Sequence, residues 1–321
     1  MARRLFLLLL AALTGALAWG QNASRPVRLI VPWSPGGGAD ISARIIAPKL
    51  GEALGAQVIV DNKPGATGVI GTDLVAKAPP DGNTLILGTN STFVIAGGLF
   101  PRLPYDPLKD LTPITRVAAV PHVLTVHPSV PARNVAELVA YLKANPDKVS
   151  FGSSGAGSTP HVAGENFKIA SSVNILHVPY KGSGQSVADT IAGNVQVSFD
   201  TLPSVIGHIR VNRLRPLAIL GPKRVAALPD VPTIGEAGYP TAEGVTWFGL
   251  YGPGGMQPAQ VNRLFNEMTK VMQLPDVAAR FKDFGAAETT SASPDEFSKM
   301  VVREIEIYSK VIKQAGITPQ Q

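Results

Sequence analysis

The 321-residue sequence contains no cysteine, which excludes disulfide bonds, a thiolate nucleophile and a metal site built on cysteine. Aromatic residues are scarce at 6%, and charged residues make up 16% of the chain. The basic residues form no run, which argues against a nucleic-acid partner. The histidines at positions 122, 127, 161, 177 and 208 lack metal-binding spacing. The sequence therefore predicts no metal and no cofactor.

Long apolar runs are also missing after the first eighteen residues. In MARRLFLLLLAALTGALA, Arg3 and Arg4 precede an apolar run of about nine residues, and Ala16-Leu17-Ala18 follows. Because a bilayer-spanning helix needs about 20 apolar residues, this segment predicts a secretory signal peptide at 1–18, cleaved after Ala18. The chain has 29 basic and 23 acidic residues, and removal of the signal peptide takes away two of the basic ones. The formal charge therefore falls from +6 to +4. This mild positive charge favours anionic small molecules.

The rest of the chain alternates apolar, strand-like runs with helical patterns. Predicted strands lie at 28–33, 56–62, 84–90, 123–128, 149–154, 175–180, 195–200 and 215–220. Predicted helices lie near 40–54, 68–78, 134–144, 160–170, 185–192, 258–272 and 294–314. This alternation is typical of the α/β class with parallel strands. Pro48 should kink or interrupt the first helix.

Glycine-rich loops join strand to helix four times. They are PGGGAD (35–40), NKPGATG (62–68), the loop at 152–159 and KGSGQ (181–185). Each directs the unpaired N–H groups of a helix start towards the carboxyl end of a sheet, where anions bind readily. The phosphate patterns G-x-x-x-x-G-K-[ST] and G-x-G-x-x-G are missing, and the loops lack arginine. Backbone amides, hydroxyls and waters would therefore hold a small carboxylate.

Long motifs in the chain resemble periplasmic substrate-binding proteins of tripartite tricarboxylate transporters, also called the Bug family. These motifs are VPWSPGGGADISAR (31–44), NKPGATGVIGTDLVAKAPPDGNTL (62–85), GSSGAGSTPHVAGENFK (152–168), HVPYKGSGQSVADTIAGNVQVSFD (177–200), LPDVPTIGEAGYP (228–240) and WFGLYGPGGMQP (247–258). They cover nearly the whole mature chain in order. The resemblance implies a periplasmic receptor, not an enzyme.

The family implies a two-lobed, type 2 periplasmic binding fold that closes around an organic acid. Each lobe is a mostly parallel sheet flanked by helices. We expect lobe 1 at 19–122 and 247–321, and lobe 2 at 123–246, with crossings near 119–122 and 245–248. Two opposed helix-terminus sites favour a dicarboxylate, and Trp33 favours an aromatic or longer-chain acid.

The resemblance further implies a monomer that delivers its ligand to a large and a small integral membrane subunit of a transporter. Presentation of the ligand to a sensor kinase stays open as an alternative. A secreted serine hydrolase built on Ser158 and His161 is a third alternative. It is disfavoured because the sequence has no G-x-S-x-G elbow.

Matching the family motifs residue by residue gives the expected binding site. Lobe 1 contributes Trp33, Ser34, Gly36, Gly37, Asp40, Ala66, Thr67, Thr89, Asn90 and Ser91. Lobe 2 contributes Ser153, Ser154, Gly155, Ser158, Thr159, His161, Tyr180, Gly182 and Asp200. For some, a structural role stays open: an N-cap for Asp40, a polar turn for 89–91, a loop cap for Asp200 and a structural hydrogen bond for His161.

Overall fold

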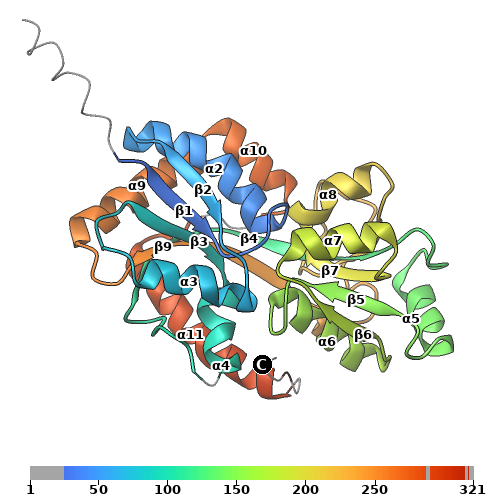
Figure 1. The fold of residues 1–321 in the computed structure, drawn as a ribbon. Coiled ribbons are helices and arrows are strands. Elements are labelled where there is room, and N and C mark those ends of the chain that lie inside the picture. Colours follow the sequence, from blue (N-terminus) through green and yellow to red (C-terminus); the bar gives the residue numbers. More distant parts are fainter. Residues whose placement is uncertain (1–24, 101, 287–289, 315–316, 318–321) are drawn as a thin grey trace, which may run out of the picture.

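The computed structural model describes residues 25–100, 102–286, 290–314 and 317 (Figure 1). The predicted signal peptide at 1–18 and its cleavage site lie outside the described residues. Within the described ranges, no helix has both the length and the apolar character needed to cross a membrane.

Strands and helices alternate along the chain, as predicted. The strands are β1 (Val27–Val31), β2 (Val58–Asn62), β3 (Thr84–Thr89), β4 (Leu111–Val126), β5 (Ser150–Ser153), β6 (Leu176–Pro179), β7 (Val197–Thr201), β8 (Arg215–Ile219) and β9 (Val245–Pro253). The helices are α2 (Gly38–Leu54), α3 (Val69–Ala76), α4 (Ala96–Leu99), α5 (Val135–Ala144), α6 (Thr159–Ser171), α7 (Ser183–Ala192), α8 (Leu202–Arg210), α9 (Pro258–Gln273), α10 (Pro275–Asp283) and α11 (Pro294–Gln314).

The long strand β4 joins two half-sheets. The strand order is β2-β1-β3-β9-β4-β7-β5-β6, and β8 also pairs with β4. Up to Pro121, β4 pairs with β9, and from His122 onwards it pairs with β7 and, from Val123, β8. We call β2, β1, β3, β9 and β4 up to Pro121 the first half-sheet. The second half-sheet is β4 from His122 with β7, β8, β5 and β6; Figure 1 shows the two side by side.

Parallel pairing is confined to the outer strands. β1 pairs in parallel with β2 and β3, and β5 with β6 and β7, whereas β4 and β9 pair antiparallel with their neighbours. The sequence prediction missed β9 and most of β4. Pro113, Pro121 and Pro253 lie in these strands, and proline weakens a strand pattern because it cannot donate to the ladder.

The first helix tolerates its proline. α2 runs from Gly38 to Leu54 through Pro48 and ends at Gly55, which has a left-handed φ of 67°. The predicted interruption is therefore wrong. Pro48 is exposed, so water can satisfy the carbonyl that its missing N–H leaves free. The helices α8 and α10 were not predicted either.

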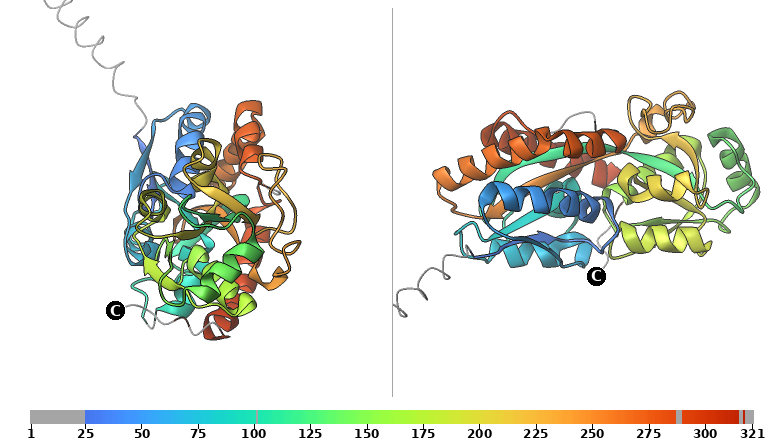
Figure 2. Two further views of the ribbon diagram at one scale, coloured as in Figure 1. Left: turned by 90° about the vertical axis from the view of Figure 1, so that its right-hand side faces the viewer. Right: turned by 90° about the horizontal axis from the view of Figure 1, so that it is seen from above.

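Helices cover both faces of each half-sheet. α2, α9 and α10 lie on one face of the first half-sheet and α3 and α11 on the other, while α7 and α6 lie on opposite faces of the second (Figures 1 and 2). One apolar cluster extends from Leu29 and Ile46 through Phe248 to Val187 and Val205, joining α2, α7 and α8. The carboxyl ends of β1 and β5 consequently face each other in the middle of the molecule.

Candidate ligand-binding site

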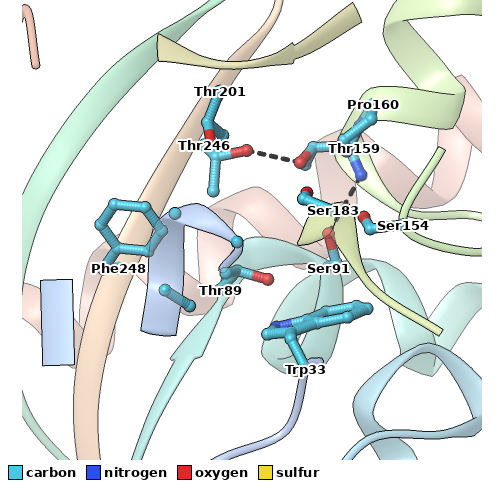
Figure 3. Close-up of a pocket in the computed structure, with 13 residues that line it drawn as sticks. Trp33, Thr89, Ser91, Ser154, Thr159, Pro160, Ser183, Thr201, Thr246 and Phe248 are labelled. Atoms are coloured by element: carbon cyan, nitrogen blue, oxygen red, sulfur yellow. Dashed lines mark hydrogen bonds between the residues drawn. The ribbon is translucent and has the colours of Figure 1, made fainter. Parts of the chain in front are cut away.

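A cavity lies where the two half-sheets meet (Figure 3). Its lining consists of Trp33, Gly37, Gly38, Ala39, Thr89, Ser91, Ser154, Thr159, Pro160, Ser183, Thr201, Thr246 and Phe248. Its volume is about 30 Å³, which exceeds the roughly 10–15 Å³ that one water needs. The cavity as it stands therefore has room for little more than water and is too small for an organic acid.

Helix N-termini converge on this cavity. α2 contributes its first residues Gly38 and Ala39, α6 contributes Thr159, α7 contributes Ser183, and α8 contributes its N-cap Thr201. Each N-terminus carries a partial positive charge and N–H groups without a helical partner. None of the described residues that line the cavity is charged, so backbone dipoles dominate its field. This field favours an anion.

Side-chain donors add to the backbone donors. The indole Nε1 of Trp33 is buried and has no hydrogen-bond partner among the described residues. Ser91 Oγ accepts from the Thr159 N–H at 3.0 Å, which leaves the Ser91 hydroxyl hydrogen free to donate. A buried N–H without an acceptor is costly, so Trp33 in particular favours a ligand that brings an acceptor.

Asp40 supports the glycine loop rather than the cavity. It is the third residue of α2, and its Oδ2 accepts from the Gly36 N–H at 2.9 Å. It also accepts from Arg44 Nε at 3.0 Å and from Asn62 Nδ2 at 3.0 Å. Burial raises the pKa of Asp40, but these hydrogen bonds outweigh it and hold the pKa below its ordinary value. Asp40 is therefore neither an N-cap nor a residue of the cavity lining; its carboxylate fixes the shape of the loop.

The glycine loop contacts the second half directly. Ser34 N–H donates to Lys181 O at 3.3 Å, and a Cβ at Gly182 would lie 2.4 Å from Ser34 Oγ. A Cβ at Gly184 would lie 1.9 Å from Pro35 O. Here glycine is required because two backbones touch. Ser34, Gly36 and Gly182 thus lie at this contact beside the cavity and do not line it.

A second contact joins the loop at 62–68 to the loop at 152–159. Thr67 Oγ1 donates to Ala156 O at 2.8 Å, with Ala66 and Thr67 in left-handed conformations at φ 46° and 52°. Ala66, Thr67, Gly155 and Tyr180 line a separate, open hollow of about 470 Å³. These predicted residues are brought together, but apart from the central cavity.

Three further predicted residues, Asn90, Ser153 and His161, make structural contacts. Asn90 Nδ2 donates to Val245 O at 3.2 Å. Ser153 Oγ lies 2.6 Å from His177 Nε2, and the His161 ring stacks on His177 with 3.7 Å between centroids. His161 Nδ1 accepts from the Gly157 N–H at 2.9 Å, as its structural alternative predicted.

Ser158 and His161 do not form a nucleophile–base pair. Ser158 Oγ accepts from the backbone N–H of His161 at 3.4 Å and so caps α6. The arrangement expected for a serine hydrolase is therefore not formed by these two residues.

Asp200 is buried next to the cavity without lining it. Its Oδ1 accepts from the Thr201 N–H at 2.8 Å. Its Oδ2 has no hydrogen-bond partner among the described residues, although Ser183 is close enough to lower the pKa. Burial outweighs these contacts and raises the pKa of Asp200 above its ordinary value.

The cavity thus gathers Trp33, Gly37, Thr89, Ser91, Ser154 and Thr159 from the predicted set. Sequence reasoning missed Gly38, Ala39, Pro160, Ser183, Thr201, Thr246 and Phe248. Gly38, Ala39 and Ser183 lie within glycine-rich motifs that were recognised, so the motifs themselves could have indicated them. Thr246 and Phe248 belong to β9, which was not predicted as a strand.

Comparison with known proteins gives the family. Residues 42–317 match the tripartite tricarboxylate transporter family receptor, TctC. The chain is 37% identical to Protein BugT of Bordetella pertussis over 294 residues, which cover 91% of this chain and 90% of BugT.

Solved structures agree with this match. The periplasmic binding protein BugD aligns with a TM-score of 0.88 at 32% identity, over 92% of this chain and 99% of BugD. Rpa4515 of R. palustris, solved with adipate, aligns with a TM-score of 0.89 at 36% identity, over 92% and 99% of the two chains. MatC of Rhodopseudomonas palustris, with bound malate, gives 0.83 at 28% identity, over 90% and 99%. The chain belongs to the tripartite tricarboxylate transporter receptor family, whose members are periplasmic solute-binding receptors of the TctC and Bug type.

Proposed function

We propose that this receptor captures a small organic dicarboxylate in the central cavity and delivers it to integral membrane subunits of a transporter. The observation that carries the proposal is the set of donors facing the cavity from both half-sheets without any cationic side chain. Donors at opposite walls suit an anionic group at each end of the ligand. The adipate and malate bound to two structural relatives support this class of ligand.

The proposal requires the two halves to separate. The cavity of about 30 Å³ is too small for a diacid, and the loops around Pro35 and Gly184 touch beside it. We propose lobes at 19–122 with 247–321 and at 123–246, which move about β4 and β9. Ligand then stabilises the closed form, because donors from both lobes reach it only when the lobes meet.

The walls of the cavity predict a ligand that is an acid with an apolar middle. Trp33, Pro160 and Phe248 bring apolar surface to the cavity, so a chain of methylene groups or an aromatic ring can lie between the two anionic ends. Such a ligand exchanges water for apolar contact at its centre, and its carboxylates accept hydrogen bonds at its ends.

A thermal-shift panel on the mature protein tests the proposal. The panel contains succinate, malate, glutarate, adipate, citrate, an aromatic dicarboxylate, aspartate, phosphate and sulfate. A ligand at 100 times its dissociation constant stabilises the folded protein by about 2.7 kcal/mol. We expect a dicarboxylate to give the largest shift. A shift with phosphate or sulfate alone would contradict the proposal.

The variant Trp33→Phe tests whether the indole N–H of Trp33 binds the ligand. This change removes the unpartnered indole N–H and keeps an aromatic wall. We expect dicarboxylate affinity to fall by about tenfold or more, as for a lost hydrogen bond to a charged group. The free protein should be no less stable, because a buried donor without an acceptor is gone. Isothermal titration and urea unfolding measure the two effects separately, and equal affinity in both proteins would remove Trp33 from the site.

A further inference from the structure

His122 lies where β4 changes partners. Pro121 pairs with Val245 of β9, and the next residue, His122, pairs with Thr201 of β7. The side chain of His122 is fully buried. It does not line the cavity, and the resemblance to the family assigned it no role.

A chain of hydrogen bonds connects His122 to the cavity. His122 Nε2 lies 2.7 Å from Thr246 Oγ1, and Thr246 Oγ1 lies 2.5 Å from Thr159 Oγ1. Thr246 and Thr159 both line the cavity, and Figure 3 shows the bond between them. Thr159 is the first residue of α6, so its hydroxyl stands beside the N–H groups of that helix start.

The surroundings of the ring decide which nitrogen carries the proton. Burial lowers the pKa of His122 to about 3, so the ring is neutral at physiological pH and has a single N–H. Its Nδ1 has no hydrogen-bond partner among the described residues, and a Cβ on Gly244 would lie 2.9 Å from it. A buried N–H without an acceptor is rarer and costlier than an unfilled lone pair. The proton therefore belongs on Nε2.

This tautomer favours one direction of the chain, because a hydroxyl that accepts a hydrogen bond becomes a stronger donor. Nε2–H donates to Thr246 Oγ1, and in the favoured direction the Thr246 hydroxyl donates to Thr159 Oγ1. The Thr159 hydrogen then has to point elsewhere, and the cavity is the space that Thr159 lines. With the proton on Nδ1, every bond would reverse and Thr159 would offer a lone pair instead.

We propose that His122 is a positioning residue that makes Thr159 a hydrogen-bond donor to the cavity and thereby selects a carboxylate at this wall. The inference deepens the proposed function and rests on it for the identity of the ligand. It also connects ligand recognition to β4 and β9, the two strands that cross between the halves, because His122 belongs to β4 and Thr246 to β9.

Histidine NMR tests the tautomer without any ligand. Protein labelled with 15N in its histidines should show one neutral ring protonated at Nε2 whose signal disappears in His122→Gln. The signal should not titrate between pH 5 and pH 8. A ring protonated at Nδ1 would overturn the proposal.

A double-mutant cycle tests the chain of hydroxyls, with the panel dicarboxylate of highest affinity among succinate, malate, glutarate and adipate as probe. Thr159→Val should weaken binding by about 10- to 100-fold and Thr246→Val by about tenfold, as expected for hydrogen bonds to a charged group. In the Thr159→Val background, Thr246→Val should cost less than about twofold, because the two residues act as one unit. Thr246→Ser should retain the coupling to Thr159.

Thr125→Val is the matched control. Thr125 also lies buried in β4, and its hydroxyl has no hydrogen-bond partner among the described residues; the variant should bind like the wild type. If the affinity losses from Thr159→Val and Thr246→Val simply multiply in the double variant, the proposed chain of hydrogen bonds is overturned, while the receptor function stays intact. If the wild type binds no dicarboxylate of the panel, the aromatic one included, the proposed function fails, and the NMR result still decides the tautomer.

Discussion

The helix starts of the two halves meet at the cavity with different chemistry. In the first half the helix start presents backbone: α2 begins at Gly37 and Gly38, and no described side chain caps it. In the second half the helix starts present hydroxyls, since Thr159, Ser183 and Thr201 line the cavity. Glycine occurs where two loops touch backbone to backbone, whereas a hydroxyl fits where a helix start opens into the cavity. Closure and recognition are thus divided between different residues.

The buried carboxyl groups show the same contrast. Asp40 in the first half receives hydrogen bonds on both oxygens, and its pKa is lowered. Asp200 in the second half has one oxygen without a hydrogen bond among the described residues, and its pKa is raised. Asp40 therefore fixes the glycine loop of the first half, whereas Asp200 leaves one carboxyl oxygen without a hydrogen bond next to the cavity.

The largest effect is expected where the backbones touch. In Gly184→Ala, the new Cβ would lie 1.9 Å from Pro35 O. We expect the ligand-bound form to keep this contact between the two loops while the cavity beside it widens, so the variant cannot close onto the ligand. Donors from one half then miss the ligand, and dicarboxylate affinity should fall by more than about 100-fold, as for two lost hydrogen bonds to charged groups. Isothermal titration measures the loss.

Gly207→Ala is the control for this closure test. Gly207 lies inside α8, and no atom lies within 4 Å of its added Cβ. The change should raise the melting temperature, because alanine stabilises a helix by up to about 1 kcal/mol over glycine, and should leave affinity unchanged. Wild-type affinity in Gly184→Ala would show that ligand binding needs no such closure.

Asp40→Asn tests the locked loop of the first half. The Asn side chain cannot accept from Gly36, Arg44 and Asn62 together, so the free energy of unfolding should fall by about 1–2 kcal/mol. Arg44 is 54% exposed, so the ion pair itself contributes little. Asp295→Asn, which breaks an exposed ion pair with Lys299, should leave the free energy of unfolding nearly unchanged.

The pH dependence of this loss has a defined sign. Because the folded pKa of Asp40 lies below its ordinary value of 3.8, its contribution is present above about pH 4. It is lost as the pH falls through the folded pKa. The difference between wild type and Asp40→Asn in urea unfolding should therefore shrink in acid. A difference that stays constant down to the lowest pH at which the protein folds would contradict the assignment.

Gly37→Val probes the same loop at a looser contact. A Cβ at Gly37 would lie 3.2 Å from Ser183 Cβ, and its backbone is extended, with φ −82° and ψ 167°. Valine can adopt this backbone, so the added methyl groups press on α7 and should weaken binding by about tenfold, or about 1.4 kcal/mol. Gly37→Ser adds the same Cβ but restores an N-cap hydroxyl and should fall between valine and wild type. Equal affinity in all three proteins would separate this loop from closure.

The contrast between the halves was partly visible in the sequence. PGGGAD, the loop at 152–159 and KGSGQ were each expected to start a helix at the site, and α2, α6 and α7 do begin there. The loop at 62–68 instead lies at a separate hollow, and α8 takes the fourth place at the cavity. No glycine-rich loop precedes α8, because β7 ends at Thr201 and α8 begins at the next residue.

The crossing strands were hidden for a different reason. Pro113 and Pro121 break the pattern of β4. The whole of β9 is VTWFGLYGP, in which two glycines and a proline weaken the strand signal. Thr246 and Phe248 could not be assigned without that strand. Position along the chain also does not reveal that Asp40 turns back to Gly36, since an acidic third residue of a helix looks the same whether it binds a ligand or its own loop.

Asp200→Asn gives the smallest effect and opposes Asp40→Asn in sign. Because the folded pKa of Asp200 lies above its ordinary value of 3.8, the folded protein binds this proton more tightly than the unfolded chain does. Its stabilising contribution is complete below pH 3.8 and is lost as the pH rises through the folded pKa. At pH 8 the raised folded pKa of Asp200 opposes folding, and asparagine removes this cost without changing shape. The variant should therefore gain on the order of 1 kcal/mol at pH 8 and nothing at pH 3.5, as measured by urea unfolding. A loss of stability at pH 8 would mean that the carboxylate is satisfied in the folded protein, and the two halves would then hold their buried acids alike.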